Sequence, residues 1–138
     1  EVRGDEVEDL YELLKDVKQQ FPTITAVSCG AIVSNYQRHR VENICQRLGW
    51  TCLSYLWQRD RNELIHEIVE KANIHAILIK VAGAGLDPNK HLKRPLKDLL
   101  PTLNLYHNKY GLDVCGEGGE YESLVLDAPF FLKKIELI

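Results

Sequence analysis

The spacing of apolar residues near the start of the chain predicts an amphipathic helix. Its apolar positions recur every three or four residues, which places them on one face of a helix. They are Val7, Leu10, Leu14, Val17 and Phe21. Asp5, followed three residues later by Glu8, is typical of a helix-capping box, and Pro22 ends the pattern.

Three further helices are predicted by the same kind of spacing. Residues 37–48 carry an apolar face and are followed by Gly49, a residue type that favours a left-handed C-cap. An acidic capping pair begins the next helix at Asp60. Pro101 is expected to begin or kink the last helix, because proline breaks a helix interior, and Gly111 stops that helix.

Apolar runs between these helices predict β-strands. The strongest run, residues 74–82, is nearly continuous, as expected of a buried parallel strand. Weaker strand signals occupy residues 25–28, 50–57, 124–126 and 131–138. Because helices and strands alternate almost throughout, the sequence predicts an α/β fold with a mostly parallel sheet and flanking helices.

Three loops follow the carboxyl ends of predicted strands, which is where ligands bind in open α/β sheets. They are residues 28–36, 81–91 and 115–122, and they share one edge of the sheet if their strands run parallel. With adjoining positions they supply a dense polar set of both charge signs. Its members are Tyr36, Arg38, Arg40, Lys80, Asp87, His91, Glu117, Glu120, Tyr121 and Glu122.

Each basic residue of this set also has a purely structural interpretation. Arg38 and Arg40 could lie at an ordinary solvated helix start, although cations in a first helical turn oppose the helix dipole. Lys80 could extend from a strand end to solvent. His91 could be an ordinary loop histidine. The sequence leaves these alternatives open.

The densest group of candidates is the stretch from Cys115 to Ser123. It holds three glutamates and three glycines, the glycines being Gly116, Gly118 and Gly119. Glycines permit a tight turn and close backbone approach, but the carboxylates would repel a phosphate unless a metal intervened. The loop therefore favours a cationic group, a metal ion or a proton. The alternative is a tight turn between two strands whose acids are simply solvated.

The composition is that of a globular protein. The 138 residues are 45% apolar and 27% charged, which suits one domain or two small lobes. The net charge of −3 gives no indication of a nucleic-acid partner. No apolar run approaches the roughly 20 residues of a membrane span. We therefore expect neither nucleic acid nor membrane as a partner.

The cysteines and the two ends of the chain add further expectations. Cys29, Cys45, Cys52 and Cys115 form no C-x-x-C pair, and the histidines show no ligand spacing. We therefore expect no metal site, reduced thiols and a cytoplasmic location. The chain begins without methionine and stops in an apolar run, so we expect a fragment of a longer protein.

Several short segments, in order along the chain, resemble one enzyme family. They are residues 4–10 (GDEVEDL), 34–38 (SNYQR), 40–43 (RVEN), 55–58 (YLWQ), 85–87 (GLD), 90–92 (KHL) and 115–122 (CGEGGEYE). Together they resemble the diphthine–ammonia ligase family, which belongs to the PP-loop ATP pyrophosphatases. The similarity spans essentially the whole chain, and the glycine-rich and Tyr-Gln-Arg segments are its specific parts.

The resemblance implies the last step of diphthamide biosynthesis. Using ATP with Mg²⁺, such an enzyme activates the diphthine carboxylate on elongation factor two as an acyl-adenylate and releases pyrophosphate, and ammonia then displaces AMP. It implies catalytic roles for Glu117, Glu120 and Glu122. The implied substrate-binding residues are Tyr36, Arg38, Arg40, Lys80, Asp87, His91, Gly116, Gly118, Gly119 and Tyr121. Residues 1–58 would be the rear of an incomplete PP-loop (HUP-like) nucleotide domain, and residues 59–138 a smaller α/β substrate lobe.

Within this reaction the acidic loop has two candidate ligands. Diphthine carries a trimethylammonium group, which cannot donate hydrogen bonds and favours carboxylates and aromatic faces. Ammonium is the other candidate, because its deprotonation yields the ammonia that attacks. The sequence does not separate the two.

The chain also departs from the family. The family's Ser-Gly-Gly-Lys-Asp-Ser PP-loop has no counterpart, Asn35 stands where many relatives have Asp, and Gly83-Ala84 replaces a bulkier pair. Without the loop that holds ATP phosphates, we expect the isolated chain to be inactive and, with sheet edges exposed, to self-associate. The alternatives are a non-catalytic docking module for elongation factor two or a partner chain, and another PP-loop amidating or thiolating enzyme.

Overall fold

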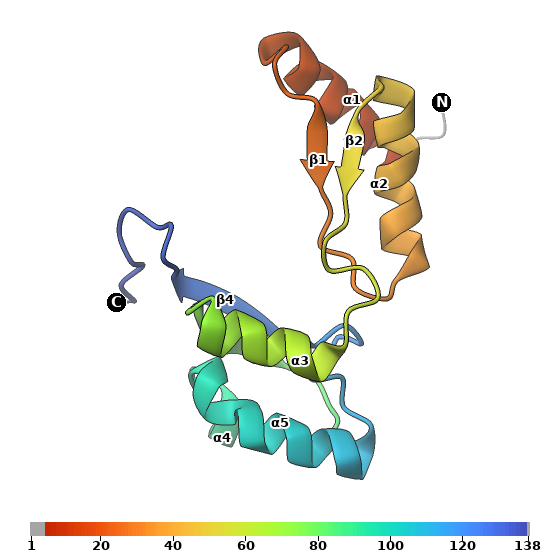
Figure 1. Cartoon of the computed structure of the whole chain (residues 1–138). Helices are drawn as coiled ribbons and strands as arrows, with labels where there is room; N and C mark the ends of the chain where they lie inside the picture. The colour runs from red at the N-terminus through yellow and green to blue at the C-terminus, as the bar shows by residue number, and fades with distance from the viewer. Residues whose placement is uncertain (1–4, 138) are drawn as a thin grey trace. The chain divides into compact units, whose positions relative to one another are not determined.

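The computed structural model describes residues 5–137, and the chain divides into two compact units, Glu1–Gln58 and Arg59–Ile138. Each unit contains both helices and a pair of strands (Figure 1), which confirms the mixed α/β composition expected from the sequence. Within residues 5–137, no helix combines the length and the apolar character needed to cross a bilayer.

The first unit is built from two helices and one parallel strand pair. Its elements are α1 (Glu6–Gln20), β1 (Ala26–Ser28), α2 (Asn35–Leu48) and β2 (Thr51–Leu53). Ala26 lies opposite Thr51, and Ser28 lies opposite Leu53. Because parallel strands require a crossover connection, the chain passes from β1 through α2 before it returns in β2. The carboxyl end of β1 therefore leads directly into the loop that precedes α2.

The helices of the first unit begin and end where local chemistry favours it. The Asp5 carboxylate accepts a 2.9 Å hydrogen bond from the Val7 N–H at the start of α1. Gly49 has a φ of 67° and caps the end of α2 in the left-handed conformation, as predicted. The N-cap of α2 is Ser34, which the apolar spacing did not predict. The apolar faces of both helices enclose a core formed by Ile44, Cys45, Leu48 and Trp50.

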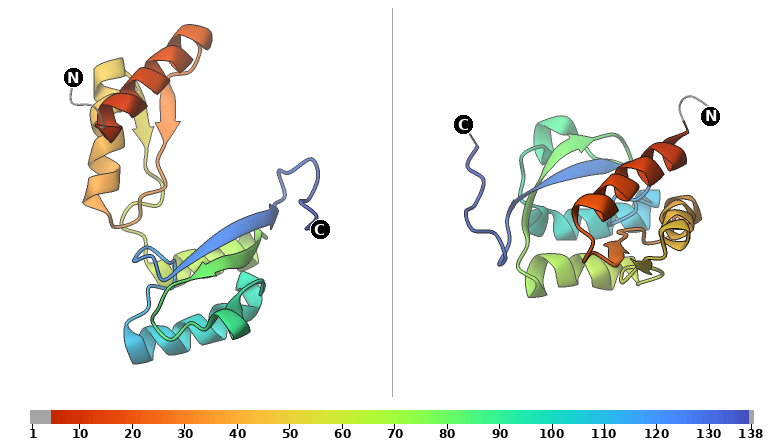
Figure 2. Two further views of the ribbon diagram at one scale, coloured as in Figure 1. Left: turned by 180° about the vertical axis from the view of Figure 1, so that it is seen from behind. Right: turned by 90° about the horizontal axis from the view of Figure 1, so that it is seen from above.

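The second unit is an antiparallel strand pair packed against helices. Its elements are α3 (Arg61–His66), the π-helical turn η1 (Glu67–Lys71), β3 (His75–Val81), α4 (Pro88–His91), α5 (Leu96–Tyr110) and β4 (Tyr121–Asp127). His75 lies opposite Asp127, and Val81 lies opposite Tyr121. Both views in Figure 2 show β3 and β4 side by side, with α3 and α5 alongside them.

One apolar core joins the helices and the sheet of the second unit. The buried residues of α5 are Leu96, Leu99, Leu100 and Leu103. They share a core with Leu78 of β3 and Tyr121 of β4, and Ile65 and Val69 complete it from α3 and η1. Burial of each such leucine contributes roughly 1.5–3 kcal/mol. This core therefore holds the sheet that carries the glycine-rich loop.

Four expectations about local structure are wrong. β3 and β4 run antiparallel, so the sheet of this unit is not parallel. The strand expected at residues 50–57 is limited to β2, because the chain turns immediately after it. Residues 131–137 form no strand, and residue 138 lies outside the described part. Pro101 lies inside α5 rather than at its start, because it is exposed to solvent while the leucines of α5 hold the helix to the core.

Candidate functional site

The two candidate loops of the second unit meet at one end of the β3–β4 sheet. Because the strands are antiparallel, the carboxyl end of β3 at Val81 lies opposite the start of β4 at Tyr121. The Ala82 N–H donates a 2.8 Å hydrogen bond to the Glu120 carbonyl and so joins the two loops. The loop at residues 28–36 follows β1 in a separate sheet, so the expectation of one edge shared by all three loops is wrong.

The glycine-rich loop is closed by hydrogen bonds among its own residues. The Gly116 N–H donates to the Asp113 carbonyl at 2.9 Å, and the Gly119 N–H donates to the Gly116 carbonyl at 3.0 Å. The Tyr121 hydroxyl donates to the Val114 carbonyl at 2.6 Å. Gly116 has a φ of +75°, and a Cβ there would lie 3.1 Å from the Tyr121 ring. Position 116 therefore requires glycine.

The three glutamates of the loop lie in three different environments. Glu117 is exposed at the surface of the loop. Glu120 is partly buried, and its Oε1 accepts a 3.0 Å hydrogen bond from the Asp113 N–H. Glu122 lies on β4, where its Oε1 is 2.7 Å from the Nζ of Lys80 on the opposite strand. Both members of that last pair are exposed, so their charges are largely screened by solvent.

Glu120 has an unusual carboxylate. Its Oε2 is shielded from solvent, and no hydrogen-bond partner for it is found among residues 5–137. A Cβ on Gly118 would lie 2.7 Å from Oε1 and 2.9 Å from Oε2, so the carboxylate occupies space that only glycine leaves open. A buried carboxylate oxygen without a donor is energetically unfavourable, and it therefore favours a proton or a ligand that donates a hydrogen bond.

Two residues that the sequence did not indicate anchor the base of the loop. Asp113 is buried, and its Oδ2 forms an ion pair with Arg61 at the start of α3. The other oxygen, Oδ1, accepts a 2.9 Å hydrogen bond from the Cys115 N–H. The Cys115 thiol in turn donates to the Arg61 carbonyl at 3.3 Å. Asp113 could have been found as a lone charge within an apolar run, whereas Arg61 carries no such signal.

Burial keeps the thiol and phenol of the loop in their neutral forms. Burial raises the pKa of Cys115 to about 11, and the negative charges of Asp113 and Glu117 add to the effect. Burial also raises the pKa of Tyr121 well above its ordinary value. Neither group ionises near neutral pH, so neither is suited to act there as a nucleophile or base.

Asp87 and His91 fix the second loop of this site. The Asp87 carboxylate caps α4 by accepting a 2.9 Å hydrogen bond from the Asn89 N–H, and this bond lowers the pKa of that carboxyl group. The Asp87 N–H donates to Nδ1 of His91 at 2.8 Å. His91 is buried, and its ring meets Tyr106 edge-on at a centroid distance of 5.9 Å. These contacts are those of residues that hold a loop in place.

The candidate residues of the first unit gather at the start of α2. The Arg38 guanidinium lies 4.1 Å from the centroid of the Trp57 ring, and the Arg40 guanidinium lies 4.8 Å from that of Tyr36. Arg40 also forms a 2.6 Å ion pair with Glu6. The arginines are therefore held against aromatic rings, where each cation–π contact contributes roughly 0.5–2 kcal/mol.

A shallow pocket of about 360 Å³ adjoins these residues at the carboxyl end of β1. Its lining includes Ser28, Gly30, Gln37 and Arg40. This is where phosphates bind in α/β folds, but Arg40 is its one lining cation and is already paired with Glu6. Within residues 5–137, no group of three or more His, Cys, Asp or Glu side chains could hold a metal.

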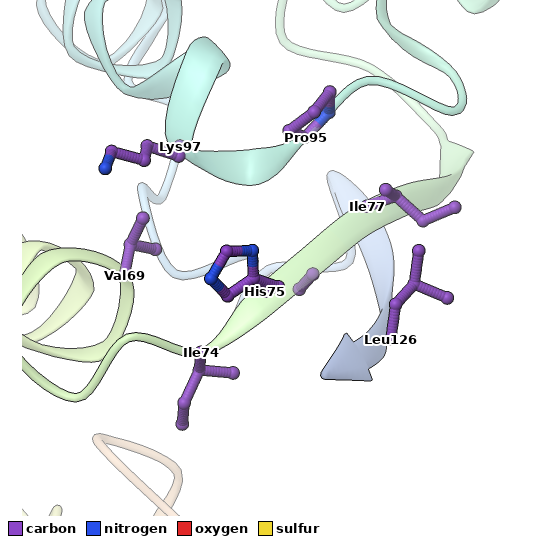
Figure 3. Close-up of a pocket in the computed structure, with 8 residues that line it drawn as sticks. Val69, Ile74, His75, Ile77, Pro95, Lys97 and Leu126 are labelled. Atoms are coloured by element: carbon purple, nitrogen blue, oxygen red, sulfur yellow. The ribbon is translucent and has the colours of Figure 1, made fainter. Parts of the chain in front are cut away.

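A second pocket, of about 150 Å³, lies at the opposite end of the β3–β4 sheet from the glycine-rich loop. Figure 3 shows its largely apolar lining. The lining residues are Val69, Ile74, His75, Ala76, Ile77, Pro95, Lys97 and Leu126. Ligand sites usually occupy about 300–1,000 Å³, so this pocket is too small for a nucleotide. We place no substrate there.

Comparison with known protein families gives two matches along the chain. Residues 1–52 match the diphthamide synthase N-terminal domain, and residues 60–138 match the diphthamide synthase C-terminal domain. Similar curated proteins are named diphthine–ammonia ligase. The one from Bos taurus is 57% identical over 132 residues, the one from Homo sapiens 55% over 132, and the one from Saccharomyces cerevisiae 48% over 143.

The alignments cover nearly all of this chain but a smaller part of its relatives. They include 96% of the chain for the bovine and human proteins and 94% for the yeast protein. They include 49% of the bovine and human proteins and 21% of the yeast protein. The chain therefore spans about half the length of the mammalian relatives it matches.

Proposed function

The chain belongs to the diphthamide synthase family, and on that premise we propose that it is part of a diphthine–ammonia ligase. The reaction converts the carboxylate of diphthine on elongation factor two into the amide of diphthamide. ATP activates the carboxylate as an acyl-adenylate with release of pyrophosphate, and ammonia displaces AMP. This chain contributes the glycine-rich acidic loop, which receives the cationic partners of that reaction.

The observation that carries this proposal is the pair of unlike carboxylates on one loop. Glu117 is exposed, and Glu120 has a buried oxygen without a hydrogen-bond partner among residues 5–137. A trimethylammonium group is bulky and donates no hydrogen bond, so an exposed carboxylate such as Glu117 suits it. Ammonium is small and donates hydrogen bonds, so it suits Glu120. Together the two residues match the two cations that meet in the reaction.

The remaining candidates support this site rather than form it. Glu122 lies opposite Lys80 on the neighbouring strand and forms an exposed ion pair with it. Asp87 and His91 hold the adjoining loop through their mutual hydrogen bond. The glycines at positions 116 and 118 leave room for the Tyr121 ring and the Glu120 carboxylate.

We propose that the first unit contributes part of the ATP-binding site. Arg38, Arg40 and Tyr36 surround the start of α2, where the helix dipole favours an anion. No step of the chemistry is assigned to them. The adjoining pocket has Arg40 as its one lining cation, so we expect further phosphate donors to come from other parts of the full-length protein.

The experiment that tests the proposal measures both products of the reaction in the full-length protein. Purified protein is mixed with diphthine-bearing elongation factor two, ATP, Mg²⁺ and ammonium. We expect AMP and pyrophosphate to form in equal amounts with the amide, detected by mass spectrometry of the modified peptide. Substitution of Glu117 by Gln should reduce amide formation, whereas the matched substitution of the exposed Glu136 should not.

A docking module is the competing function, and the same experiment separates it. Such a module would bind elongation factor two without consuming ATP. Binding without AMP, pyrophosphate or amide in the full-length protein would therefore overturn the ligase proposal and favour docking. Formation of a thiolated product, or an amide on another acceptor, would favour a different PP-loop enzyme.

A further inference from the structure

The base of the glycine-rich loop is fastened to the first turn of α3 by three contacts. The Arg61 guanidinium pairs with Oδ2 of Asp113, and the Cys115 thiol donates to the Arg61 carbonyl at 3.3 Å. Oδ1 of Asp113 accepts the Cys115 N–H at 2.9 Å. Asp113 lies two positions before the loop, Cys115 is its first residue, and Arg61 is more than 50 positions away from Asp113. We call these three residues the loop clip.

The loop clip leads directly to Glu120. Asp113 makes two contacts. Its carboxylate pairs with Arg61, and its backbone N–H donates a 3.0 Å hydrogen bond to Oε1 of Glu120. That N–H is the hydrogen-bond donor that the structure gives the Glu120 carboxylate. A movement of the Asp113 backbone would therefore remove the contact that orients Glu120 beside Gly118.

Burial makes this pair different from the other ion pair near the start of α3. The Asp113 side chain is only 9% exposed, whereas the Arg61 side chain is 42% exposed. In the neighbouring pair, Arg59 and Glu67 are 39% and 41% exposed. The exposed Arg59–Glu67 pair contributes little to stability. In the other pair, removal of the Arg61 guanidinium leaves the Asp113 carboxylate as an unpaired buried charge, which is strongly unfavourable. The loop would then have to rearrange.

We propose that Arg61 and Asp113 are positioning residues of the ligase, which hold Glu120 in the orientation in which it receives its cationic ligand. The proposal rests on the function proposed above for the acidic loop. It assigns to these two residues a role in holding the loop rather than in contacting substrate. They act through the Asp113 N–H and the loop backbone on the Glu120 carboxylate, which receives the cationic ligand.

The first test follows the clip itself and needs no enzymatic activity. In the full-length protein, the rate at which a maleimide labels Cys115 at pH 7.5 is measured by peptide mass spectrometry. Asp113→Asn and Arg61→Gln should each raise that rate about tenfold or more, because an opened loop exposes the thiol and lowers the pKa of Cys115 from about 11 toward its ordinary value. Arg59→Gln is the matched control and should leave the rate unchanged.

Arg61→Lys is included in case Asp113→Asn or Arg61→Gln fails to fold. It keeps the charge but loses the planar guanidinium, so it should fold and still label faster than the unsubstituted protein. Circular dichroism confirms that each variant is folded. Unchanged labelling in folded Asp113→Asn and Arg61→Lys would overturn the proposal, because the loop would then hold its conformation without the clip.

The second test asks whether the clip acts through Glu120. Amide formation is measured for Arg61→Lys, Glu120→Gln and the double variant. Displacement of a group that binds a reactant can lower the rate on the order of 100-fold. Because Arg61→Lys displaces Glu120, we expect it to raise the KM for ammonium and to leave the KM for ATP unchanged. In the Glu120→Gln background, Arg61→Lys should have almost no further effect.

The outcomes separate the two proposals. Independent, multiplicative losses in the double variant would overturn the positioning role while leaving the ligase function intact. No amide formation by the unsubstituted full-length protein would overturn the proposed function, and with it the role of Glu120. The labelling result would still decide whether Arg61 and Asp113 hold the loop.

Discussion

The hydroxyl of Tyr121 donates a 2.6 Å hydrogen bond to the carbonyl oxygen of Val114, across the whole length of the glycine-rich loop. Both residues are buried in the core of the second unit. The bond therefore ties the end of the loop to its beginning, and the Tyr121 ring fills the space beside Gly116. The shape of the acidic loop depends on a residue that does not itself need to contact a substrate.

Substitution of Tyr121 by Phe removes this bond and leaves a buried carbonyl without its donor. We expect the free energy of unfolding to fall by about 1–3 kcal/mol, measured by urea denaturation. Tyr55→Phe is the control, because Tyr55 is 76% exposed and should change the stability by less than about 0.5 kcal/mol. Equal stability of the two variants would show that the Tyr121 hydroxyl does not hold the loop.

Substitution of Gly118 by Ala should displace the Glu120 carboxylate without unfolding the protein. The new Cβ would lie 2.7 Å from Oε1 of Glu120, and the flexible end of that side chain can move away. Amide formation should fall about tenfold or more. The denaturation midpoint should stay near that of the control variant Gly30→Ala, because nothing lies within 4 Å of a Cβ added at Gly30. Unchanged activity would mean that the orientation of Glu120 does not matter.

The helix boundaries were largely predictable, because they depend on neighbouring residues. Gly49 and Asp60 act as caps in the predicted places. The direction of β4 was not predictable, because an apolar run such as residues 124–126 is the same pattern in a parallel and an antiparallel pair. Pairing is decided by contacts distant in sequence, here between Val81 and Tyr121.

The glycine-rich loop was recognisable from its composition, but its organisation was not. The sequence placed three glutamates in one glycine-rich stretch and did not separate their roles. The structure separates them, because Glu122 already belongs to β4 and Glu120 turns inward to the Asp113 N–H. Arg61 lies more than 50 residues before Asp113 and joins it only through the fold of the second unit.

The raised pKa values of Cys45 and Cys115 predict a loss of stability at high pH. Burial raises both pKa values to about 11 from an ordinary value of 9.0, so the folded state favours the neutral thiols. Their contribution to the free energy of unfolding is complete below pH 9 and is lost as the pH rises from about 9 to 11. Thiolate absorbance at 240 nm, compared between the unsubstituted protein and Cys115→Ser, measures the ionisation. A Cys115 thiolate signal near pH 8 would contradict this.

ATP binding by residues 1–138 alone should be far weaker than by the full-length protein. The sequence contains no Ser-Gly-Gly-Lys-Asp-Ser segment, and the pocket at the start of α2 has Arg40 as its one lining cation. Isothermal titration calorimetry with and without Mg²⁺ compares the two proteins. Tight, magnesium-dependent binding by the 138-residue chain would show that its own residues complete a nucleotide site.

We propose that the acidic loop serves cationic substrates rather than the nucleotide, and an ammonium titration of two full-length variants tests this assignment most directly. Glu117→Gln and Glu120→Gln should each bind ATP within about twofold of the unsubstituted protein while forming less amide. Raising the ammonium concentration should restore amide formation in Glu120→Gln but not in Glu117→Gln, where the defect lies in holding the trimethylammonium group. Loss of ATP binding in either variant would contradict this role, because the loop would then serve the phosphates.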